Sequence, residues 1–221
     1  SVASWVTGNK NTQISNDVRP GSKGGKSVLI TSNSVFFTVA NGTMTTGRMM
    51  ADALSASSKK NRAEIDPSST DRDTNGDPFY ATITGKPDSL AVWVKFIQGR
   101  PSATYPYASI SAAITDGTKY QDPEDKAYTN VMAKAKNNKI VTNEGQWQRI
   151  VIPFEYVNKS IEGKHILVTI STNATPGGGS GSDKLYVDDI ELIYNAGIES
   201  TTITGSTISV TPQGAGAFVR T

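Results

Sequence analysis

Oxygen-bearing side chains are concentrated in one short stretch, Asp71-Arg72-Asp73-Thr74-Asn75-Gly76-Asp77. Oxygen ligands occur at its first, third and fifth positions and a glycine at its sixth, as at the start of a calcium-binding loop. The twelfth position is Thr82 rather than the bidentate glutamate of a complete loop. The pattern therefore predicts either an Asp- and Asn-rich turn or a calcium site, whose ligands would be Asp71, Asp73, Asn75 and Asp77.

A second acidic pair, Asp188-Asp189, interrupts the apolar stretch from Lys184 to Tyr194. Because side chains alternate between the two faces of a strand, one of the two carboxylates is expected to point inward. A buried carboxylate requires a cation or hydrogen-bond donors. We therefore expect either a structural calcium ion at this pair, the only cofactor that the sequence suggests, or an arginine or backbone partner.

Aromatic residues are the second kind of candidate, because sugar-binding β-sandwiches stack aromatic rings on the C–H faces of sugars. In the stretch 89–98, every even-numbered residue from Leu90 to Phe96 is apolar. Trp93 and Lys95 therefore fall on the opposite face of the predicted strand. An indole that this hydrophobic stripe does not require offers a large apolar area to a ligand. The alternative is that Trp93 packs beneath a loop.

Three tyrosines complete the predicted ligand-binding set. The 101–107 loop follows the same strand after Gly99, so its tyrosines can fold back over the Trp93 face. A further tyrosine flanks a later loop, whereas Trp147 opens a strand and is expected to anchor the core. The predicted ligand-binding residues are Trp93, Lys95, Tyr105, Tyr107 and Tyr120.

Catalytic chemistry finds less support in the residue pattern. Glycoside hydrolysis needs two carboxylates roughly 5–10 Å apart on either side of the scissile bond. The single histidine, His165, lies in an apolar stretch without a serine-nucleophile motif, so a structural role is expected. No catalytic residue is predicted, because the spacing pairs no two of the available acids, which include Asp66, Glu144, Glu155 and Asp188.

The elements that must position these residues are β-strands. Alternating apolar residues predict strands over 26–37, 89–98, 108–114, 147–154, 165–171 and 184–194. The turn signals Asn41-Gly42 and Asp116-Gly117 and the Gly-rich loop 176–182 separate them. A long surface loop is expected over 58–78, a loop or short helix over 44–57 and a short helix over 123–136. Without a βαβ rhythm, the pattern predicts an all-β, jelly-roll-like antiparallel β-sandwich that resembles carbohydrate-binding modules.

Composition narrows the class of protein. The 221 residues are 36% hydrophobic and 19% charged, with 22 Lys and Arg against 20 Asp and Glu. A formal charge of +2 gives no electrostatic case for nucleic acid or an anionic membrane as partner. The chain has no Cys, which excludes a disulfide, a zinc–thiolate site and a cysteine nucleophile. No run of about 18 apolar residues is present, so no transmembrane segment is expected.

The sandwich is expected to occupy residues 1–195, with recognisable strands from about residue 5. Residues 196–221 change in character and predict either C-terminal strands that pair with the sandwich or the start of a truncated following domain. Because Ser1 opens directly into folded-looking sequence, any signal peptide or lipid anchor is expected to lie outside these residues.

Eight short segments, in their order along the chain, resemble the PCMD (carbohydrate-metabolism domain) family. They are WVTGN at 5–9, GKSVLIT at 25–31, GDPF at 76–79, KPDSL at 86–90, WVKF at 93–96, WQRIVIPF at 147–154, ILVTIST at 166–172 and LYVDDIELIY at 185–194. The family occurs in exported and surface-anchored lipoproteins of gut Bacteroidales. The resemblance implies a jelly-roll sandwich with a glycan role; it supplies no catalytic residues, and the acidic loop at 66–77 is not one of its motifs.

Three classes of function follow. The first is an exported, non-catalytic glycan-binding module that recognises an oligo- or polysaccharide at the cell surface, outer membrane or periplasm. Its only membrane contact would be a lipid anchor outside this sequence. The second is a glycoside hydrolase that uses a carboxylate pair, and the third is an adhesion or scaffold β-sandwich.

Overall fold

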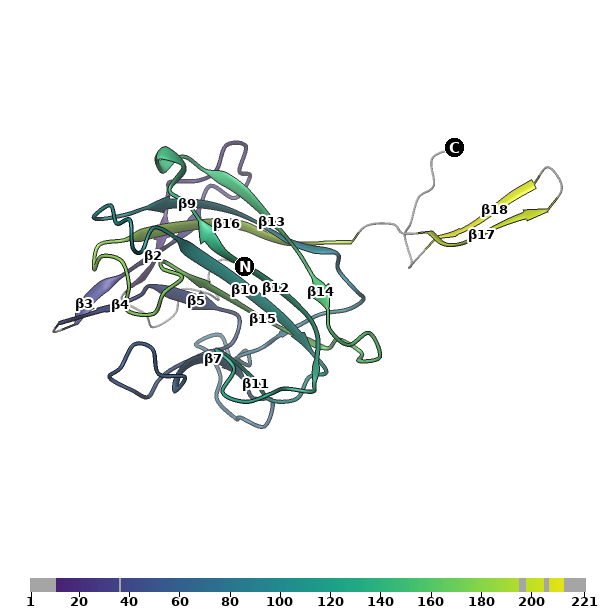
Figure 1. Cartoon of the computed structure of the whole chain (residues 1–221), viewed down its shortest axis with the longest axis horizontal. Helices are drawn as coiled ribbons and strands as arrows, with labels where there is room; N and C mark the ends of the chain where they lie inside the picture. Colours follow the sequence, from purple (N-terminus) through teal and green to yellow (C-terminus); the bar gives the residue numbers. More distant parts are fainter. Residues whose placement is uncertain (1–10, 36, 195–197, 205–206, 213–221) are drawn as a thin grey trace.

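The protein is all-β, as the alternation predicts, and its sheets are antiparallel (Figure 1). A computed structural model describes residues 11–35, 37–194, 198–204 and 207–212; for the last two ranges it describes the backbone alone. Two large sheets face each other as the layers of a jelly-roll-like sandwich, and a small third sheet lies against one of them. In the described ranges, no helix is long and apolar enough to cross a membrane.

The first large sheet has the strand order β1-β2-β16-β9-β13. Its strands, in that order, are Thr12–Ser15, Ser27–Thr31, Lys184–Ile193, Ser89–Ile97 and Gln148–Pro153. The second large sheet has the order β14-β12-β10-β15-β5, with β8 also paired to β15. Its strands are Glu155–Tyr156, Val131–Ile140, Ala108–Thr115, His165–Ser171, Thr43–Thr45 and Ala81–Thr82.

The smaller units complete the architecture. The three-stranded sheet has the order β11-β7-β6, with Tyr120–Asp122, Asn61–Ile65 and Arg48–Ala51. Two hairpins pair β3 with β4 and β17 with β18, and their strands are Asn33–Val35, Thr38–Ala40, Ile198–Thr204 and Thr207–Pro212. A 3-10 turn, η2, spans Asn143–Gly145. Within the described ranges, β17 and β18 pair only with each other; a further domain after residue 195 stays a prediction.

The main core lies between the two large sheets. The even-numbered residues of β9, from Leu90 to Phe96, pack with buried residues of β10 and β15 such as Ile110 and Ile170. A second cluster forms on the outer face of the second sheet, where Ala113 and Leu167 meet the three-stranded sheet. The second sheet is therefore covered on both faces, which explains why four consecutive residues of β10, from Ala112 to Thr115, are all buried.

The predicted helix over 123–136 is wrong. Val131, Ala133 and Ala135 are buried on strand β12, and Ala127 is exposed in the preceding turn. Residues four apart lie on the same face of a helix, but they also lie on the same face of a strand. Pairing with β10 selects the strand here. The 44–57 region forms much of β5 and all of β6, and the predicted 26–37 strand is split into β2 and β3 at Ser32.

A bulge in β16 lets the apolar residues on both sides of the acidic pair face the same core. Leu185 and Val187 are buried before the acidic pair, and Ile190 and Leu192 pack against the core after it. The register with β9 shifts between Asp188 and Glu191, and Asp189 adopts a φ of 43°. The one extra residue shifts the frame of alternation, so both halves of the strand face the core.

The fully buried ring of Phe96 provides a test of this packing. We expect Phe96→Ala to lower the free energy of unfolding by about 3–5 kcal/mol, because it loses apolar burial and leaves a cavity. Val151→Ala removes an exposed side chain from the same sheet and serves as the control. Equal losses in denaturant unfolding for the two variants would contradict the assigned core.

Candidate functional site

The outer face of the first sheet carries an aromatic group. Trp93 and Lys95 of β9 lie on this face, as the alternation predicts, and Tyr186 of β16 lies beside Lys95. Trp147 meets the Tyr186 ring edge-on, with 6.3 Å between centroids. Trp147 therefore does not anchor the core as expected; its indole N–H donates to Asp17 instead, at 3.0 Å.

The connection between β1 and β2 lies over this face as a strap, defined here as residues 17–19. The Lys95 ammonium donates to the Asp17 carboxylate at 2.6 Å. The Arg19 guanidinium carbon lies 5.5 Å from the centroid of the Trp93 ring, a cation–π arrangement. The structure thus places Trp93 beneath a loop, which is the alternative that the sequence left open.

Arg19 also provides the partners of the acidic pair in β16. Its backbone N–H donates to the buried Asp188 carboxylate at 3.3 Å, and its side-chain Nε–H donates to Asp189 at 2.5 Å. Asp188 does not turn into the main core, because it pairs with Trp93 on the outer face. Backbone and arginine donors therefore supply partners for this pair, and a calcium ion at the same place stays a prediction.

Tyr105 and Tyr107 lie at another place in the fold. The Gln98 side chain donates to the Tyr105 carbonyl at 3.1 Å. Gln98 is five residues beyond Trp93, a distance of about 16 Å along an extended chain. The Tyr105 carbonyl also accepts a bond from Asn173 at the start of the Gly-rich loop. The predicted cluster of these tyrosines with Trp93 is therefore not formed.

A buried acid that sequence reasoning missed holds this end together. The Asp183 carboxylate is fully buried and accepts N–H bonds from Gly99 at 2.8 Å and from Ser180 at 2.9 Å. Its backbone carbonyl accepts the N–H of Ser32 at 2.9 Å. One residue thereby ties the Gly-rich loop to the β9–β10 connection and to the chain after β2. The sequence signal that could have identified Asp183 is its position, an acidic residue between a Gly-rich loop and the start of a strand.

The glycines permit close approach of neighbouring segments. A Cβ atom on Gly178 would lie 2.7 Å from the Tyr105 ring, and one on Gly177 would lie 2.9 Å from the Cβ of Ala56. Both distances are too short for a real side chain, so the loop backbone forms a floor between Tyr105 and the β6–β7 connection. Thr38 of the β3–β4 hairpin also lies next to Gly177.

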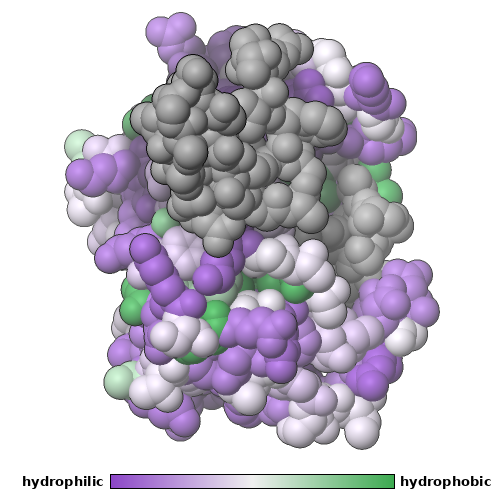
Figure 2. Space-filling model, turned by 90° about the vertical axis from the view of Figure 1, so that its right-hand side faces the viewer, coloured by the Kyte–Doolittle hydropathy of each residue, from purple (hydrophilic) through white to green (hydrophobic). Residues whose placement is uncertain are grey.

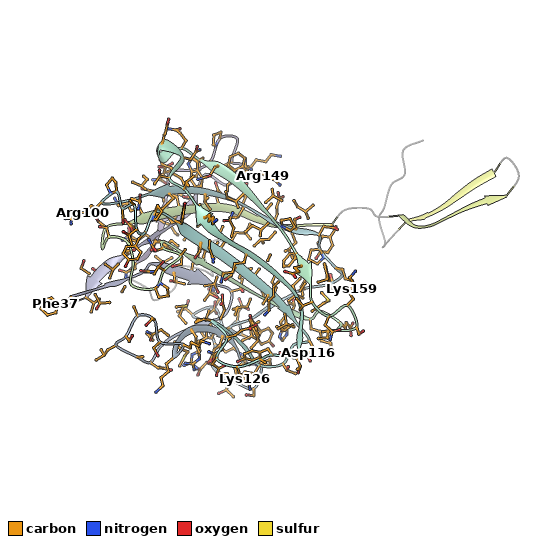
Figure 3. All side chains as sticks on the ribbon, in the orientation of Figure 1. Phe37, Arg100, Asp116, Lys126, Arg149 and Lys159 are labelled. Atoms are coloured by element: carbon orange, nitrogen blue, oxygen red, sulfur yellow. The ribbon has the colours of Figure 1, made fainter. Side chains whose placement is uncertain are left out.

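Two aromatic rings at this end of the molecule are accessible to solvent. Tyr105 is 38% exposed and Phe37, at the tip of the β3–β4 hairpin, is fully exposed. Figure 3 places Phe37 at the same end of the molecule as Arg100, which precedes the tyrosines. Sequence reasoning missed Phe37 by including it in a strand. We call Phe37, Tyr105, Tyr107 and the Gly-rich loop 176–182 the aromatic end.

Phe37 and Arg100 lie on the left in Figure 3, which is the side turned away from the viewer in Figure 2. Figure 2 faces the opposite side of the molecule, which is mainly hydrophilic outside the grey atoms. A cleft of about 450 Å³ lies between the large sheets beside the β16 bulge, and mostly apolar core side chains line it.

Tyr120 is a core residue rather than a ligand contact, which corrects the sequence expectation. Its side chain is 3% exposed and belongs to the second cluster. The ring packs edge-on against Tyr128 at 4.9 Å, and its hydroxyl donates to Glu124 at 3.1 Å. Burial raises the pKa of Tyr120. The strand β11 that carries it was read from sequence as the edge of a loop.

The acidic stretch 71–77 forms a turn. Asp73 accepts the N–H groups of Asn75 and Asp77, each at 2.8 Å, and these bonds lower the pKa of its carboxyl. Asp71 forms an ion pair with Arg48 of β6. Among the residues that the structure describes, no three His, Cys, Asp or Glu side chains form a group that could hold a metal ion. These bonds are those of an Asp- and Asn-rich turn, and a calcium site formed by Asp71, Asp73, Asn75 and Asp77 stays a prediction.

His165 has the packing expected of a structural histidine. Its ring stacks on Tyr80 with 4.2 Å between centroids, and burial lowers its pKa. The acids named from sequence are distributed over separate elements. Asp66 pairs with Lys119 at 2.8 Å, Asp188 contacts Arg19, and Glu144 and Glu155 are exposed.

Similar folds occur among solved structures. Two crystal structures are each described as a “putative glycoside hydrolase”. The one from Bacteroides thetaiotaomicron has a TM-score of 0.58 and 15% identity, over 84% of this chain and 57% of that one. The one from Bacteroides vulgatus has a TM-score of 0.51 and 14% identity, over 83% of this chain and 77% of that one. These TM-scores show that the fold is shared.

A third comparison is weaker. The CBM27-1 module of Caldicellulosiruptor saccharolyticus, crystallised with mannohexaose, has a TM-score of 0.35 and 11% identity over 85% of each chain, too low to support an argument. No family model and no curated protein matches the sequence.

The buried Asp183 carboxylate gives a prediction about the aromatic end. We expect Asp183→Ala to lower the free energy of unfolding by about 1–3 kcal/mol, because two backbone N–H groups lose their acceptor. Thr175→Ala alters an exposed side chain near the same loop and is the control. Urea unfolding measures both, and a loss no larger than that of the control would show that Asp183 does not hold the loop.

The strap gives a prediction that depends on pH. Hydrogen bonding to Lys95 lowers the pKa of Asp17 from its usual 3.8. A lowered folded-state pKa contributes stability above the unfolded value, and this contribution is lost as pH falls through the folded value. Lys95→Met should therefore cost about 0.5–1 kcal/mol at neutral pH, since the pair is partly exposed. Urea midpoints should show a smaller cost at about pH 2, and a cost independent of pH would contradict the pairing.

Proposed function

We propose that this protein is an exported, non-catalytic glycan-binding module and that the aromatic end is its binding surface. The observation that carries the proposal is a pair of accessible rings at one end of the molecule: Tyr105, which lies against closely packed glycine backbone, and Phe37, at the tip of the β3–β4 hairpin. Exposed aromatic side chains are costly to leave without a partner, because they present large apolar areas to water. A ring held against a firm loop, as Tyr105 is against Gly178, can stack on the C–H face of a sugar.

Polar groups beside the rings suit the hydroxyls of a sugar. Ser180 and Ser182 bond to each other at 3.0 Å in the Gly-rich loop, and Arg100 is exposed on the β9–β10 connection. The loop is fixed by Asp183, so little conformational freedom would be lost on binding. A surface of this kind favours weak, rapidly reversible binding; Kd values from micromolar to millimolar correspond to about 4–8 kcal/mol.

Two further lines support the carbohydrate assignment. The sequence resembles the PCMD family of exported and surface lipoproteins. The fold is shared with two Bacteroides proteins, each described as a “putative glycoside hydrolase”. On the basis of this resemblance to the PCMD family, we also propose that the protein is located at the cell surface, the outer membrane or the periplasm. Stacking rings hold a sugar chain, whereas hydrolysis would also need two carboxylates that face each other across it.

The proposal is tested by a glycan array followed by calorimetry on the glycan that binds best. Tyr105→Ala and Phe37→Ala should each weaken binding at least tenfold, which equals about 1.4 kcal/mol. Tyr194→Ala is the matched control, because Tyr194 is an exposed tyrosine directly after the end of β16. Circular dichroism establishes that each variant is folded.

Two outcomes would overturn the proposal. Unchanged affinity in both aromatic variants would remove the aromatic end as the site. Release of reducing sugar from the bound glycan by the parent protein would replace the binding function with the hydrolase alternative.

A further inference from the structure

A polar cleft of about 500 Å³ opens on the three-stranded sheet β11-β7-β6. All eight residues that line it are polar or charged. Arg62, Glu64 and Gln121 form its floor, and Lys59, Lys60 and Asp125 stand on the connections around it. This volume falls in the range of small-molecule sites.

The floor is unusual because polar side chains are buried on the face turned away from the sandwich. Ala63 and Ile65 of β7 point toward the second core cluster, so Arg62 and Glu64 point to the other side. Gln121 pairs with Glu64 in register and shares that side. Nevertheless, Glu64 is only 4% exposed and Gln121 only 6%. The surrounding connections therefore shield these polar side chains from water, although they lie on the outer face of the sheet.

Hydrogen bonds hold the floor in place. The Gln121 side-chain amide donates to the carbonyls of Lys59 at 3.2 Å and Pro123 at 2.9 Å. Arg62 donates to Glu64 at 2.8 Å, to Asp52 at 2.9 Å and to the Lys60 carbonyl at 2.8 Å. A ligand would meet groups that are already oriented, which lowers the entropic cost of binding.

Charge and composition define the class of ligand. Four cationic side chains line the cleft: Lys59, Lys60, Arg62 and Lys119. Four carboxylates balance them: Glu64 and Asp125 of the lining, Asp52, which pairs with Arg62, and Asp66, which pairs with Lys119. A balanced site has no net attraction for an ion. The lining residues are all polar or charged, so they offer an apolar ligand only the carbon stems of their side chains. A hydroxyl both donates and accepts hydrogen bonds, so it matches closely spaced donors and acceptors.

We propose that the polar cleft binds one neutral sugar unit through its hydroxyl groups. The site goes beyond the proposed function, because other strands form it and it contains no stacking ring. It adjoins the aromatic end: the β6–β7 connection contributes Ala56 next to Gly177 and Ser58 to the cleft.

The test is an NMR titration of the isotopically labelled protein with the neutral methyl glycosides of glucose, mannose and galactose. At least one should shift backbone amides within 58–64 and 119–125, with a Kd of order millimolar. Lys60→Ala should weaken this binding at least threefold, while Lys136→Ala, an exposed lysine on β12, should not. Tyr105→Ala should leave the cleft shifts unchanged, so failure here is separable from failure at the aromatic end.

Other results would overturn the proposal. Absence of shifts in these segments at sugar concentrations of about 100 mM, far above a millimolar Kd, would exclude the site. Glucuronate or glucosamine binding tenfold tighter than the neutral glycosides would replace hydroxyl recognition with recognition of charge.

Discussion

The aromatic end depends on one buried carboxylate, that of Asp183. Taking a charge out of water is costly unless donors replace the lost solvation. Two backbone N–H groups, from Gly99 and Ser180, supply bonds of this charge-assisted kind. They come from two connections that are far apart in sequence, so satisfying the charge also fixes the relative position of those connections. The glycines then let Tyr105 and Ala56 approach the loop backbone.

The proposed sites lie away from the faces of the two large sheets, because other parts of the chain lie over those faces. The second sheet is packed on both faces, by the first sheet and by part of the three-stranded sheet. The outer face of the first sheet carries the strap, which binds Trp93, Lys95 and the acidic pair of β16. The loops at one end and the outer side of the three-stranded sheet carry the polar and aromatic groups that form the two proposed sites.

Much of the fold could be predicted from sequence because strand alternation is a local property. The stripe from Leu90 to Phe96 identified β9 and its buried face, and the apolar stretch around Asp188 identified β16. The helix expected over 123–136 failed because a four-residue spacing also fits a strand, and only pairing with β10 decides between them.

The site could be predicted only in part, because exposure depends on distant contacts. Trp93 was placed on the correct face, but Arg19, which covers it, is far away in sequence. Tyr120 looked like a loop residue until the packing of the three-stranded sheet buried it. Phe37 was hidden within an apparent strand, and the role of Asp183 depends on a bond to Gly99 across the fold.

The most direct test of the central claim is a crystal structure of the protein with the oligosaccharide that it binds best. The account predicts a sugar ring stacked on Tyr105 or Phe37, with hydroxyls facing the Gly-rich loop. A sugar bound instead on the outer face of the first sheet, with Arg19 displaced from Trp93, would contradict it.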